Sequence, residues 1–525
     1  MKYLILFIYV LFSGAASAVK YPLGSTLCGA YPQAQVGTAK GVCVGVVTQR
    51  DQGARWVKPR RIVQVPGTQQ FLVTDMGGWQ RGKGVVWLVD TKIKPATHKA
   101  LLTQLKLPHG LELGPDGRFY VGESHRIFRF TLQDKQAMGV ETVVRDLPDF
   151  TRHSHPLSHF IFDQQGNLIV NIGAPSDQCK EDAREVFCRA VNNTNETQAA
   201  VRRYRYLPEA NRWAVDYEVV ASGVRNSMAL ASHESGVLLQ AENSIDLPEL
   251  KHPFEEINRI DTGGFYGWPY CYDNKKINRL WPTYGRQICH DPQAHKQPWV
   301  LMPAHTAPLD MHYYQGAMFP SLKDTLLVSW HGYRKTGHRL VAYKVDEKGL
   351  PIRSRSAYYM IDSESHGRNH SFSQVAFPPV DNIAQAQELI SKMNAVQGVR
   401  PRGRPAGMTV AEDGAIWLLD DVNKALLRIA KGNAYQATVA TDGATTTIPV
   451  KSPDMARIFL TRCQACHQLP TRVDKMHIPK QWLQKNNQIS VLEQRVFHSP
   501  MRPMPPDTPL TEQQRQVLKR WLATM

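Results

Sequence analysis

The sequence predicts an all-β six-bladed propeller over residues 19–431, a linker over residues 432–451 and a small all-α domain over residues 452–525. A turn followed by a short strand recurs six times in the first region. The second region is rich in Thr, Ala and Gly, as flexible linkers are, and helix-capping signals follow it in the third. The 525 residues, 42% of them apolar, suffice for one large and one small domain with filled cores.

The repeated unit combines a tight turn with a short apolar or alternating strand. Its six copies lie at residues 67–73, 116–121, 165–170, 235–239, 323–328 and 413–418. The turn residues are 50, 49, 70, 88 and 90 residues apart, and a second strand follows several copies about ten residues on. These intervals predict a propeller with insertions in its later half. A pair of β-sandwiches is the alternative, but it explains so many similar units less well.

The first 18 residues have the pattern of a cleavable secretory signal. Lys2 precedes an apolar run over residues 3–12, and residues 13–18 are small and end in Ala-Ser-Ala. The run is shorter than the ~20 apolar residues of a membrane-spanning helix, and no later stretch is long and apolar enough to span a bilayer. We expect a periplasmic protein without a transmembrane segment. An N-terminal anchor or a buried core helix is the alternative.

The chain is basic, with 63 Lys and Arg against 46 Asp and Glu and a formal net charge of +17 at pH 7. Such an excess is typical of proteins that meet nucleic acid, an anionic membrane surface or an acidic partner. Export argues against a nucleic-acid role. We therefore expect the charge to attract an acidic electron carrier or an anionic membrane surface.

Six of the eight cysteines fall into three local pairs, separated by 15, 9 and 18 residues. Local pairs in an oxidising compartment usually form disulfides. A metal site is the alternative, but it favours tighter spacing with histidines nearby. The predicted disulfides are Cys28–Cys43, Cys179–Cys188 and Cys271–Cys289.

The other two cysteines belong to a C-x-x-C-H motif, formed by Cys463, Cys466 and His467, which is the attachment motif of c-type heme. The two thiols add to the two vinyl groups of one porphyrin, and the adjacent His reaches the iron. A thioredoxin-like redox pair needs no such His, and a zinc site needs a second ligand pair. The motif therefore predicts a covalently bound heme c.

Two further signals predict a small cytochrome around this motif. Thr511 and Gln514 form a capping box at the start of a helix expected over residues 511–523. Just before it, Met504 is followed by two prolines, which resembles the sixth-ligand segment of class I cytochromes c. We predict a cytochrome c domain with His467 and Met504 as the axial iron ligands, and Met501 as the alternative to Met504. A thioether ligand raises the reduction potential, which suits an electron acceptor.

Three motifs in the predicted propeller loops resemble the soluble quinoprotein sugar dehydrogenases, which include glucose, aldose and sorbosone types. In chain order they are Gly-Val-Arg-Asn at residues 223–226, Glu-Ile-Asn at residues 256–258 and Tyr-Gly-Trp-Pro at residues 266–269. The resemblance covers most of residues 60–431. It implies a six-bladed propeller that binds pyrroloquinoline quinone (PQQ) over its channel, beside a calcium ion. Fusion to a cytochrome c resembles the quinohemoproteins.

The resemblance also implies which residues bind the quinone. Arg225, Asn226 and Arg404 match cofactor-binding positions, and the planar fork of arginine suits the three carboxylates of PQQ. His109 stands where simpler members have a cofactor glutamine. Arg334 is added by its position in a loop alone.

Calcium prefers hard oxygen ligands, and the resemblance implies the Glu256 carboxylate and the Tyr266 backbone carbonyl. The catalytic base of the family corresponds to His155, with His153 and His159 close enough in the chain to be alternatives. Histidine suits this role because it is partly neutral near neutral pH.

Departures from the family pattern concern the substrate. An acidic residue that orients the base in the family is replaced by Ala174, and Asp177 is the candidate to take over its role. Ala406 replaces a second late arginine. These changes point away from glucose and toward a sorbosone-like branch.

The sequence thus predicts an exported quinohemoprotein that oxidises an aldose or a related sugar aldehyde to a lactone or acid. Hydride passes to PQQ and a proton to His155, and electrons continue through heme c to an external acceptor such as a cytochrome or a cupredoxin. A calcium-dependent lactonase-like hydrolase and a non-catalytic, heme-bearing binding propeller are the alternatives.

Overall fold

The computed structural model describes residues 21–435 and three shorter segments, residues 447–449, 477–479 and 510–522. Within the first range it leaves out residues 22, 150–154, 186, 193–196, 248, 250–251, 333–335, 355–358, 363–371, 376–381 and 394–402. The expected signal peptide therefore lies outside the described residues, and so do His153, Arg334, Cys463, Cys466, His467, Met501 and Met504.

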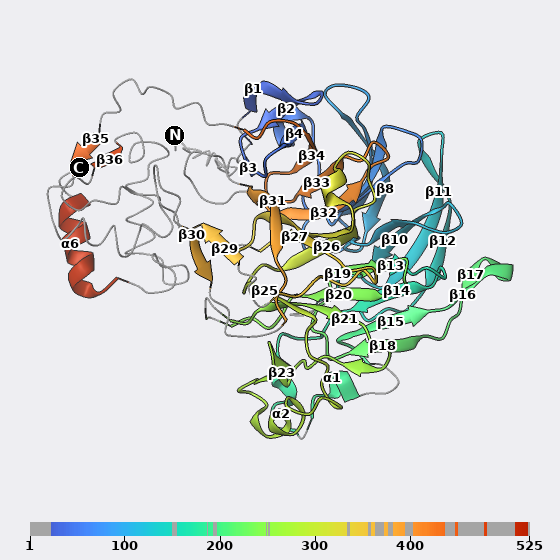
Figure 1. Ribbon diagram of the computed structural model, residues 1–525. Helices are drawn as coiled ribbons and strands as arrows, with labels where there is room; N and C mark the ends of the chain where they lie inside the picture. Colours follow the sequence, from blue (N-terminus) through green and yellow to red (C-terminus); the bar gives the residue numbers. More distant parts are fainter. Residues whose placement is uncertain are drawn as a thin grey trace, which may run out of the picture.

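Six sheets follow one another along the chain as the blades of a β-propeller (Figure 1). Blade 1 consists of β5 (Pro59–Gln64), β6 (Gln70–Asp75), β7 (Gly84–Asp90) and β8 (Thr97–Leu105). Blade 2 consists of β9 (Leu111–Leu113), β10 (Phe119–Glu123), β11 (Arg126–Gln133) and β12 (Gln136–Val144). Blade 3 consists of β13 (Phe160–Phe162), β14 (Leu168–Ile172), β15 (Ala200–Tyr204) and β18 (Glu218–Ser222), with β22 (Gly264–Phe265) at its edge.

The second half of the propeller follows the same plan. Blade 4 consists of β19 (Ala229–Ser232), β20 (Leu238–Glu242), β21 (Glu255–Arg259) and β25 (Val300–Met302). Blade 5 consists of β26 (Pro308–Tyr313), β27 (Thr325–Trp330), β28 (Arg339–Lys344) and β31 (Ala386–Lys392), with β3 (Gly37–Thr38) at its edge. Blade 6 consists of β32 (Pro405–Val410), β33 (Ile416–Asp420), β34 (Ala425–Lys431), β4 (Val42–Thr48), β2 (Tyr31–Ala34) and β1 (Leu23–Cys28).

The first strand of each blade lies innermost. These strands contact one another in a ring, in the order β5, β9, β13, β19, β26, β32 and back to β5, so they surround a central channel. The six repeated segments of the sequence are β6, β10, β14, β20, β27 and β33, the second strand of every blade. Their turns use glycine where the backbone needs a positive φ, as at Gly117 (73°) and Gly166 (77°). The prediction of an all-β six-bladed propeller is confirmed.

The ring is closed by the N-terminal part of the chain. Strand β4 pairs with β34 in blade 6, with Thr48 opposite Leu426 and Val42 opposite Lys431. Blade 6 thus combines the first and the last strands of the propeller, and neither is left as a free sheet edge there. Apolar side chains of both strands, Val44 and Val46 with Leu427 and Ile429, are buried in the same core cluster.

Two long insertions extend from blades 3 and 4. The sequence predicts insertions in the later half of the propeller, and the insertion in blade 3 lies outside that half. The two insertions lie between β14 and β15 and between β21 and β25, and they carry α1 (Arg189–Asn192) and α2 (Pro282–Ile288), which lie together below the blades in Figure 1. A common core with Trp268 and Trp281 joins them. All three predicted disulfides are present, Cys28–Cys43, Cys179–Cys188 and Cys271–Cys289.

The remaining elements are short. The two-stranded pairs are β16 (Tyr206–Leu207) with β17 (Arg212–Trp213), β23 (Cys271–Tyr272) with β24 (Lys276–Ile277), β29 (Tyr359–Asp362) with β30 (Phe372–Val375), and β35 (Thr447–Pro449) with β36 (His477–Pro479). Single 3₁₀ turns lie at Arg50–Gln52, Lys180–Asp182, Pro208–Ala210 and Pro320–Leu322.

A helix near the C-terminus, α6 (Glu512–Leu522), has the predicted capping box. The Thr511 backbone N–H donates to Gln514 Oε1 (3.0 Å), and the Gln514 backbone N–H donates to Thr511 Oγ1 (3.3 Å). Among the described residues, no helix is both long and apolar enough to cross a membrane.

We predict that Leu427→Ala weakens the closure of the ring. Leu427 is fully buried opposite Val46 in β4, so its truncation should lower the free energy of unfolding by about 2–5 kcal/mol. Urea unfolding followed by tryptophan fluorescence measures this. Val215→Ala is the matched control, because Val215 is 95% exposed and its truncation should change stability by less than about 0.5 kcal/mol. Equal effects of the two substitutions would contradict the closure argument.

Candidate active site

One end of the channel collects polar side chains from all six blades. The six innermost strands start at this end. In each blade the second strand runs antiparallel to the first and returns along it. Residues at or near these starts come from parts of the chain hundreds of residues apart. They are Arg61 in blade 1, His109 in blade 2, His159 in blade 3, Arg225 in blade 4, Asp310 in blade 5 and Arg404 in blade 6.

His155 lies just before β13 and is oriented by a backbone carbonyl. Its Nδ1 lies 2.9 Å from the carbonyl oxygen of Ala174, and its backbone N–H donates to the same oxygen (3.2 Å). A carbonyl oxygen can accept hydrogen bonds but not donate them, so Nδ1 carries the proton and Nε2 carries the lone pair. Burial, and then the charge of Arg225, lower the pKa of His155 to about 3. The neutral ring therefore presents Nε2 as a base.

Ala174 and Asp177 have different partners in the structure. Ala174 is fully buried, and its carbonyl orients His155. Asp177 pairs with Arg225, whose Nη2 lies 2.9 Å from Asp177 Oδ1. The contacts thus place Asp177 with the arginine and the Ala174 backbone with the histidine. A side chain at Gly173 would crowd His155, since a Cβ there would lie 2.5 Å from the His155 Cβ.

Arg225 is a buried centre of hydrogen bonding beside His155. Its backbone carbonyl accepts from the Ala174 N–H (2.7 Å), and its backbone N–H donates to Glu242 Oε1 (2.6 Å). Its Nη1 donates to the Asn243 carbonyl (2.9 Å), while its buried Nε has no hydrogen-bond partner among the described residues. One bonded unit therefore joins the histidine, the arginine and the start of blade 4.

Asn226 follows Arg225 and faces blade 3. Its Oδ1 accepts from Asn171 Nδ2 (3.4 Å), and its backbone carbonyl accepts from the N–H groups of Met228 (2.9 Å) and Asn243 (3.1 Å). The Asn171 Oδ1 accepts from the Ser227 N–H (3.1 Å). These contacts hold the predicted Arg-Asn pair at the junction of blades 3 and 4.

Two buried histidines line the channel beside this unit. The rings of His109 and His159 have centroids 6.0 Å apart and meet edge to face. Burial, and then Arg60 at His109 and Arg61 at His159, lower the pKa of each ring well below its ordinary value. Among the described residues, no hydrogen-bond partner is found for either ring nitrogen of His159 or for Nδ1 of His109.

Two buried arginines of blade 1 form ion pairs with residues of other blades. Arg61 pairs with Asp310 in β26 and with Glu112 (2.8 Å), and Arg60 pairs with Asp421 (2.8 Å) after β33. Burial alone would raise the pKa of Asp421, but His331 and then Arg60 hold it well below its ordinary value.

Arg404 lies on the same side as Asp421. Its backbone N–H donates to Asp420 Oδ1 (3.0 Å). Burial is the main cause that lowers the pKa of His331, and the charges of Arg60 and Arg404 lower it further. Ala406, which replaces the second late arginine, is fully buried. The structure thus brings His109, Arg225, Asn226 and Arg404 to one end of the channel with His155.

The predicted calcium ligands lie in different surroundings. Glu256 stands opposite Glu242 in the β20–β21 pair and accepts from Asn258 Nδ2 (3.3 Å). Burial raises the pKa of Glu242 to about 8 and raises that of Glu256 well above its ordinary value. The carbonyl of Tyr266 accepts a hydrogen bond from His295. The buried carboxylates fit a cation, whereas the Tyr266 carbonyl has a protein partner.

A cluster with the spacing of metal ligands lies away from these carboxylates. Among the described residues, the one set of three ligand atoms within 4.8 Å of one another comes from Cys179, Asp182 and Cys188. Its two sulfurs are joined in a disulfide and are not available to a metal.

Several members of this site were missed by the sequence analysis. Arg60, Arg61, Asp310 and Asp421 are isolated polar residues in their local sequences, outside any motif. The signal that could have found them is positional. A charged residue near the start of an innermost strand faces the channel, and each of these lies there or at the matching end of another strand.

The residues present fit a polar planar group at this end of the channel. Buried polar atoms without protein partners are rare in folded proteins. Here His109, His159, Arg225 and Ser227 each have at least one such atom among the described residues. A ligand with several hydrogen-bonding oxygens and nitrogens would satisfy them.

We predict that His159→Gln reduces the loss of stability at acid pH. His159 has a lowered pKa in the folded state, so the unfolded chain binds more protons below about pH 6.5 and stability falls as pH decreases. Gln does not titrate. The difference in unfolding free energy, wild type minus variant, should therefore shrink by about 1.6 kcal/mol between pH 6.5 and pH 5. Urea titrations at each pH measure it, and a constant difference would contradict the prediction.

Comparison with solved structures agrees with this architecture. The chain is similar to the iodide structure of Trichoderma reesei Carbohydrate-Active Enzymes Family AA12, with TM-score 0.55 and 18% identity, over 78% of this chain and 100% of that one. It is also similar to the holo form of the pyranose dehydrogenase PQQ domain from Coprinopsis cinerea, with TM-score 0.54 and 18% identity, over 77% and 99%. At these identities the comparison establishes the propeller fold.

Sequence comparisons give the family. A pyrroloquinoline quinone-dependent pyranose dehydrogenase of Coprinopsis cinerea is 22% identical over 299 residues, 50% of this chain and 40% of that protein. The chain matches 40% to 62% of the length of its curated relatives. A protein-family model described as TrAA12-like matches residues 54–431, which is more than half of this sequence. The chain therefore belongs to the TrAA12-like family.

Proposed function

We propose that this protein is a PQQ-dependent dehydrogenase that oxidises an aldose or a related sugar aldehyde to a lactone or acid. The observation that carries the proposal is the unit formed by His155, Ala174 and Arg225, in which a neutral imidazole is fixed with Nε2 as its basic nitrogen. Family membership and the similarity to PQQ-dependent pyranose dehydrogenase support it.

The base acts on the hydroxyl at the anomeric carbon of the sugar. His155 Nε2 accepts the hydroxyl proton while the carbon loses a hydride, and Nδ1 keeps its proton on the Ala174 carbonyl. Burial and the charge of Arg225 lower the pKa of His155 to about 3, so the ring is unprotonated across the neutral range. When bound, PQQ supplies the hydride acceptor.

Four described residues would hold the quinone. Arg225 and Arg404 would bind its carboxylates, and Asn226 and His109 would bind its carbonyl and ring atoms. The unpartnered Nε of Arg225 and Nδ1 of His109 support this assignment. Arg334 is proposed for the same role from the sequence alone.

A pocket of about 350 Å³ lies beside the insertions of blades 3 and 4, and His155 is not among the residues that line it. It is lined by Gln178, which follows the Asp177 that pairs with Arg225, and by Leu247, which follows the Asp246 that pairs with the same arginine. Glu249 and Asn278 add polar groups to its wall. The proposal of a sorbosone-like aldehyde rests on the sequence departures at Ala174 and Ala406 and not on this pocket.

We include calcium in the proposal on the strength of the buried carboxylates. Glu256 and Glu242 face each other with raised pKa values, and a cation between them would let both remain ionised. The Tyr266 carbonyl is proposed as a second ligand from the sequence resemblance, and it would have to leave His295 to serve.

The C-terminal region completes the proposal. Cys463 and Cys466 would attach a heme c, and His467 and Met504 would coordinate its iron. That heme supplies one-electron transfer to an external acceptor such as a cytochrome or cupredoxin. The three disulfides support an oxidising compartment, in agreement with export to the periplasm.

The first experiment uses the purified full-length protein, oxidised and loaded with calcium and PQQ. A panel of aldoses and sorbosone is added while the heme absorption bands and an artificial dye are followed. We expect at least one sugar to reduce the heme in a reaction that requires PQQ. Dye reduction without heme reduction would support the dehydrogenase and reject the transfer to heme. Failure of the protein to bind PQQ would overturn the proposal.

We predict that His155→Gln lowers kcat/KM for the active sugar by about 10²–10⁴, because the general base is lost. PQQ binding, measured by dialysis, should remain, since the quinone is assigned to other side chains. Gly173→Ala should lower activity in the same direction by displacing the His155 backbone. His290→Gln is the matched control, because His290 is exposed outside the site. Full activity in His155→Gln would remove His155 from the mechanism.

A further inference from the structure

A second and larger pocket lies at the opposite end of the propeller, between blades 1 and 6. Strand β5 begins near Arg60 at the catalytic end and finishes at Gln64, which lines this pocket. The pocket is formed by the β5–β6, β7–β8 and β32–β33 turns and by the β1–β2 hairpin. Its volume is about 960 Å³, enough for a ligand of several sugar rings.

Aromatic rings form one wall of this pocket. Trp417 packs on Phe71 with centroids 4.3 Å apart, and Tyr31 meets Trp417 edge to face at 6.1 Å. Tyr31 is half-buried and so keeps part of its surface open, with Lys94 over its ring. Phe71 is 1% and Trp417 5% exposed, so Tyr31 offers most of the aromatic surface on which the apolar C–H face of a pyranose ring could pack.

Four of the five charged side chains that line the pocket are bonded within the protein, and the fifth, Lys92, is exposed. Arg428 donates to Asp413 (2.6 Å), Glu412 accepts from the Gly67 N–H (2.8 Å), and Asp90 accepts from Gln70 Nε2 (2.9 Å). The three carboxylates stand against Lys92 and Arg428, so the pocket is nearly balanced in charge and favours a neutral, polar ligand.

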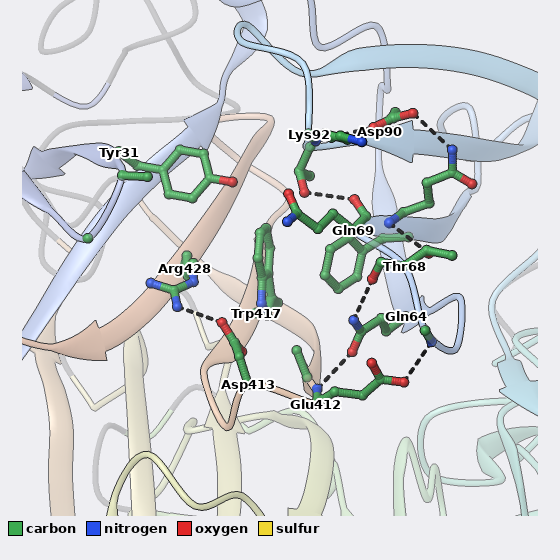
Figure 2. A pocket seen from close by; sticks show the side chains of 17 residues that line it. Tyr31, Gln64, Thr68, Gln69, Asp90, Lys92, Glu412, Asp413, Trp417 and Arg428 are labelled. Atoms are coloured by element: carbon green, nitrogen blue, oxygen red, sulfur yellow. Dashed lines mark hydrogen bonds and ion pairs between the residues drawn. The ribbon is translucent and has the colours of Figure 1, made fainter.

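One buried donor in the wall lacks a partner. The Nε1 of Trp417 is shielded from solvent and has no hydrogen-bond partner among the described residues, although the side chain is 5% exposed overall. Figure 2 shows the Trp417 indole edge-on, with Arg428 and Asp413 on one side and Gln69 on the other. Such a donor normally has a partner in folded proteins. Because the atom is shielded in this structure, a ligand hydroxyl would reach it only after the groups that cover it move.

We propose that this pocket is a second, non-catalytic binding site for a neutral oligosaccharide. The faces of the sugar rings would pack on the aromatic wall. The sugar hydroxyls would hydrogen-bond to the amides of Gln64 and Gln69 and to the charged groups around them. The proposal does not depend on the dehydrogenase activity, because every residue that carries it lies at the other end of the propeller.

The test measures binding of cellotriose, maltotriose and xylotriose to the full-length protein by saturation-transfer NMR, without added quinone so that no sugar is consumed. We expect at least one trisaccharide to bind. Its affinity should fall about tenfold in Tyr31→Ala, which removes the open ring, and about fivefold in Trp417→Phe, which keeps the packing and removes the Nε1 donor. Urea unfolding of both variants shows that they are folded.

Trp79→Phe is the matched control, because Trp79 is 62% exposed in the β6–β7 loop at the catalytic end. It should leave trisaccharide affinity unchanged. Loss of affinity in Trp79→Phe or His155→Gln, with none in the two pocket variants, would place the sugar at the catalytic end and overturn the proposal. Absence of binding for all three trisaccharides would overturn it as well.

Discussion

The pairing of β4 with β34 is the contact on which the rest of the structure depends. Each blade alone is a small sheet with two exposed faces, and it becomes stable only by packing between two neighbours. Joining the N-terminal strand to the last blade makes blades 1 and 6 neighbours and completes the ring. Arg60 then reaches Asp421 across 361 residues of sequence (2.8 Å), and Tyr21 donates to Asp420 (2.6 Å).

The closed ring explains the electrostatics of the catalytic end. Buried titratable side chains favour their uncharged forms, which lowers the pKa of histidine and raises that of a carboxylic acid. His155 and Glu242 show the two directions, with pKa values of about 3 and about 8. A carboxylate beside His155 would counteract this effect, whereas the Ala174 carbonyl orients the ring without adding a charge. The imidazole therefore stays neutral to lower pH.

Sequence predicted the parts of the structure that local rules determine. The six turn-and-strand units and the three disulfides depend on neighbours within about twenty residues, so their patterns are visible in the chain. The Arg-Asn pair at Arg225 was singled out in the sequence because it lies in a motif. Arg61 and Asp310 were not, since their meeting depends on the order in which the blades close. The His295 contact of the Tyr266 carbonyl likewise arises from an insertion whose path no local pattern predicts.

The two ends of the propeller differ in how their polar groups are satisfied, and this difference follows from the same strands. At the catalytic end, His159 and Arg225 have buried nitrogens without protein partners, which suits a site that takes a polar cofactor. At the opposite end, Asp413 and Glu412 are bonded within the protein, and the apolar surface of Tyr31 and Trp417 lies between them. A ligand held there cannot meet His155, since the length of β5 separates the two sites. Binding at that end would therefore keep the enzyme near a carbohydrate source while the channel remained open to small sugars.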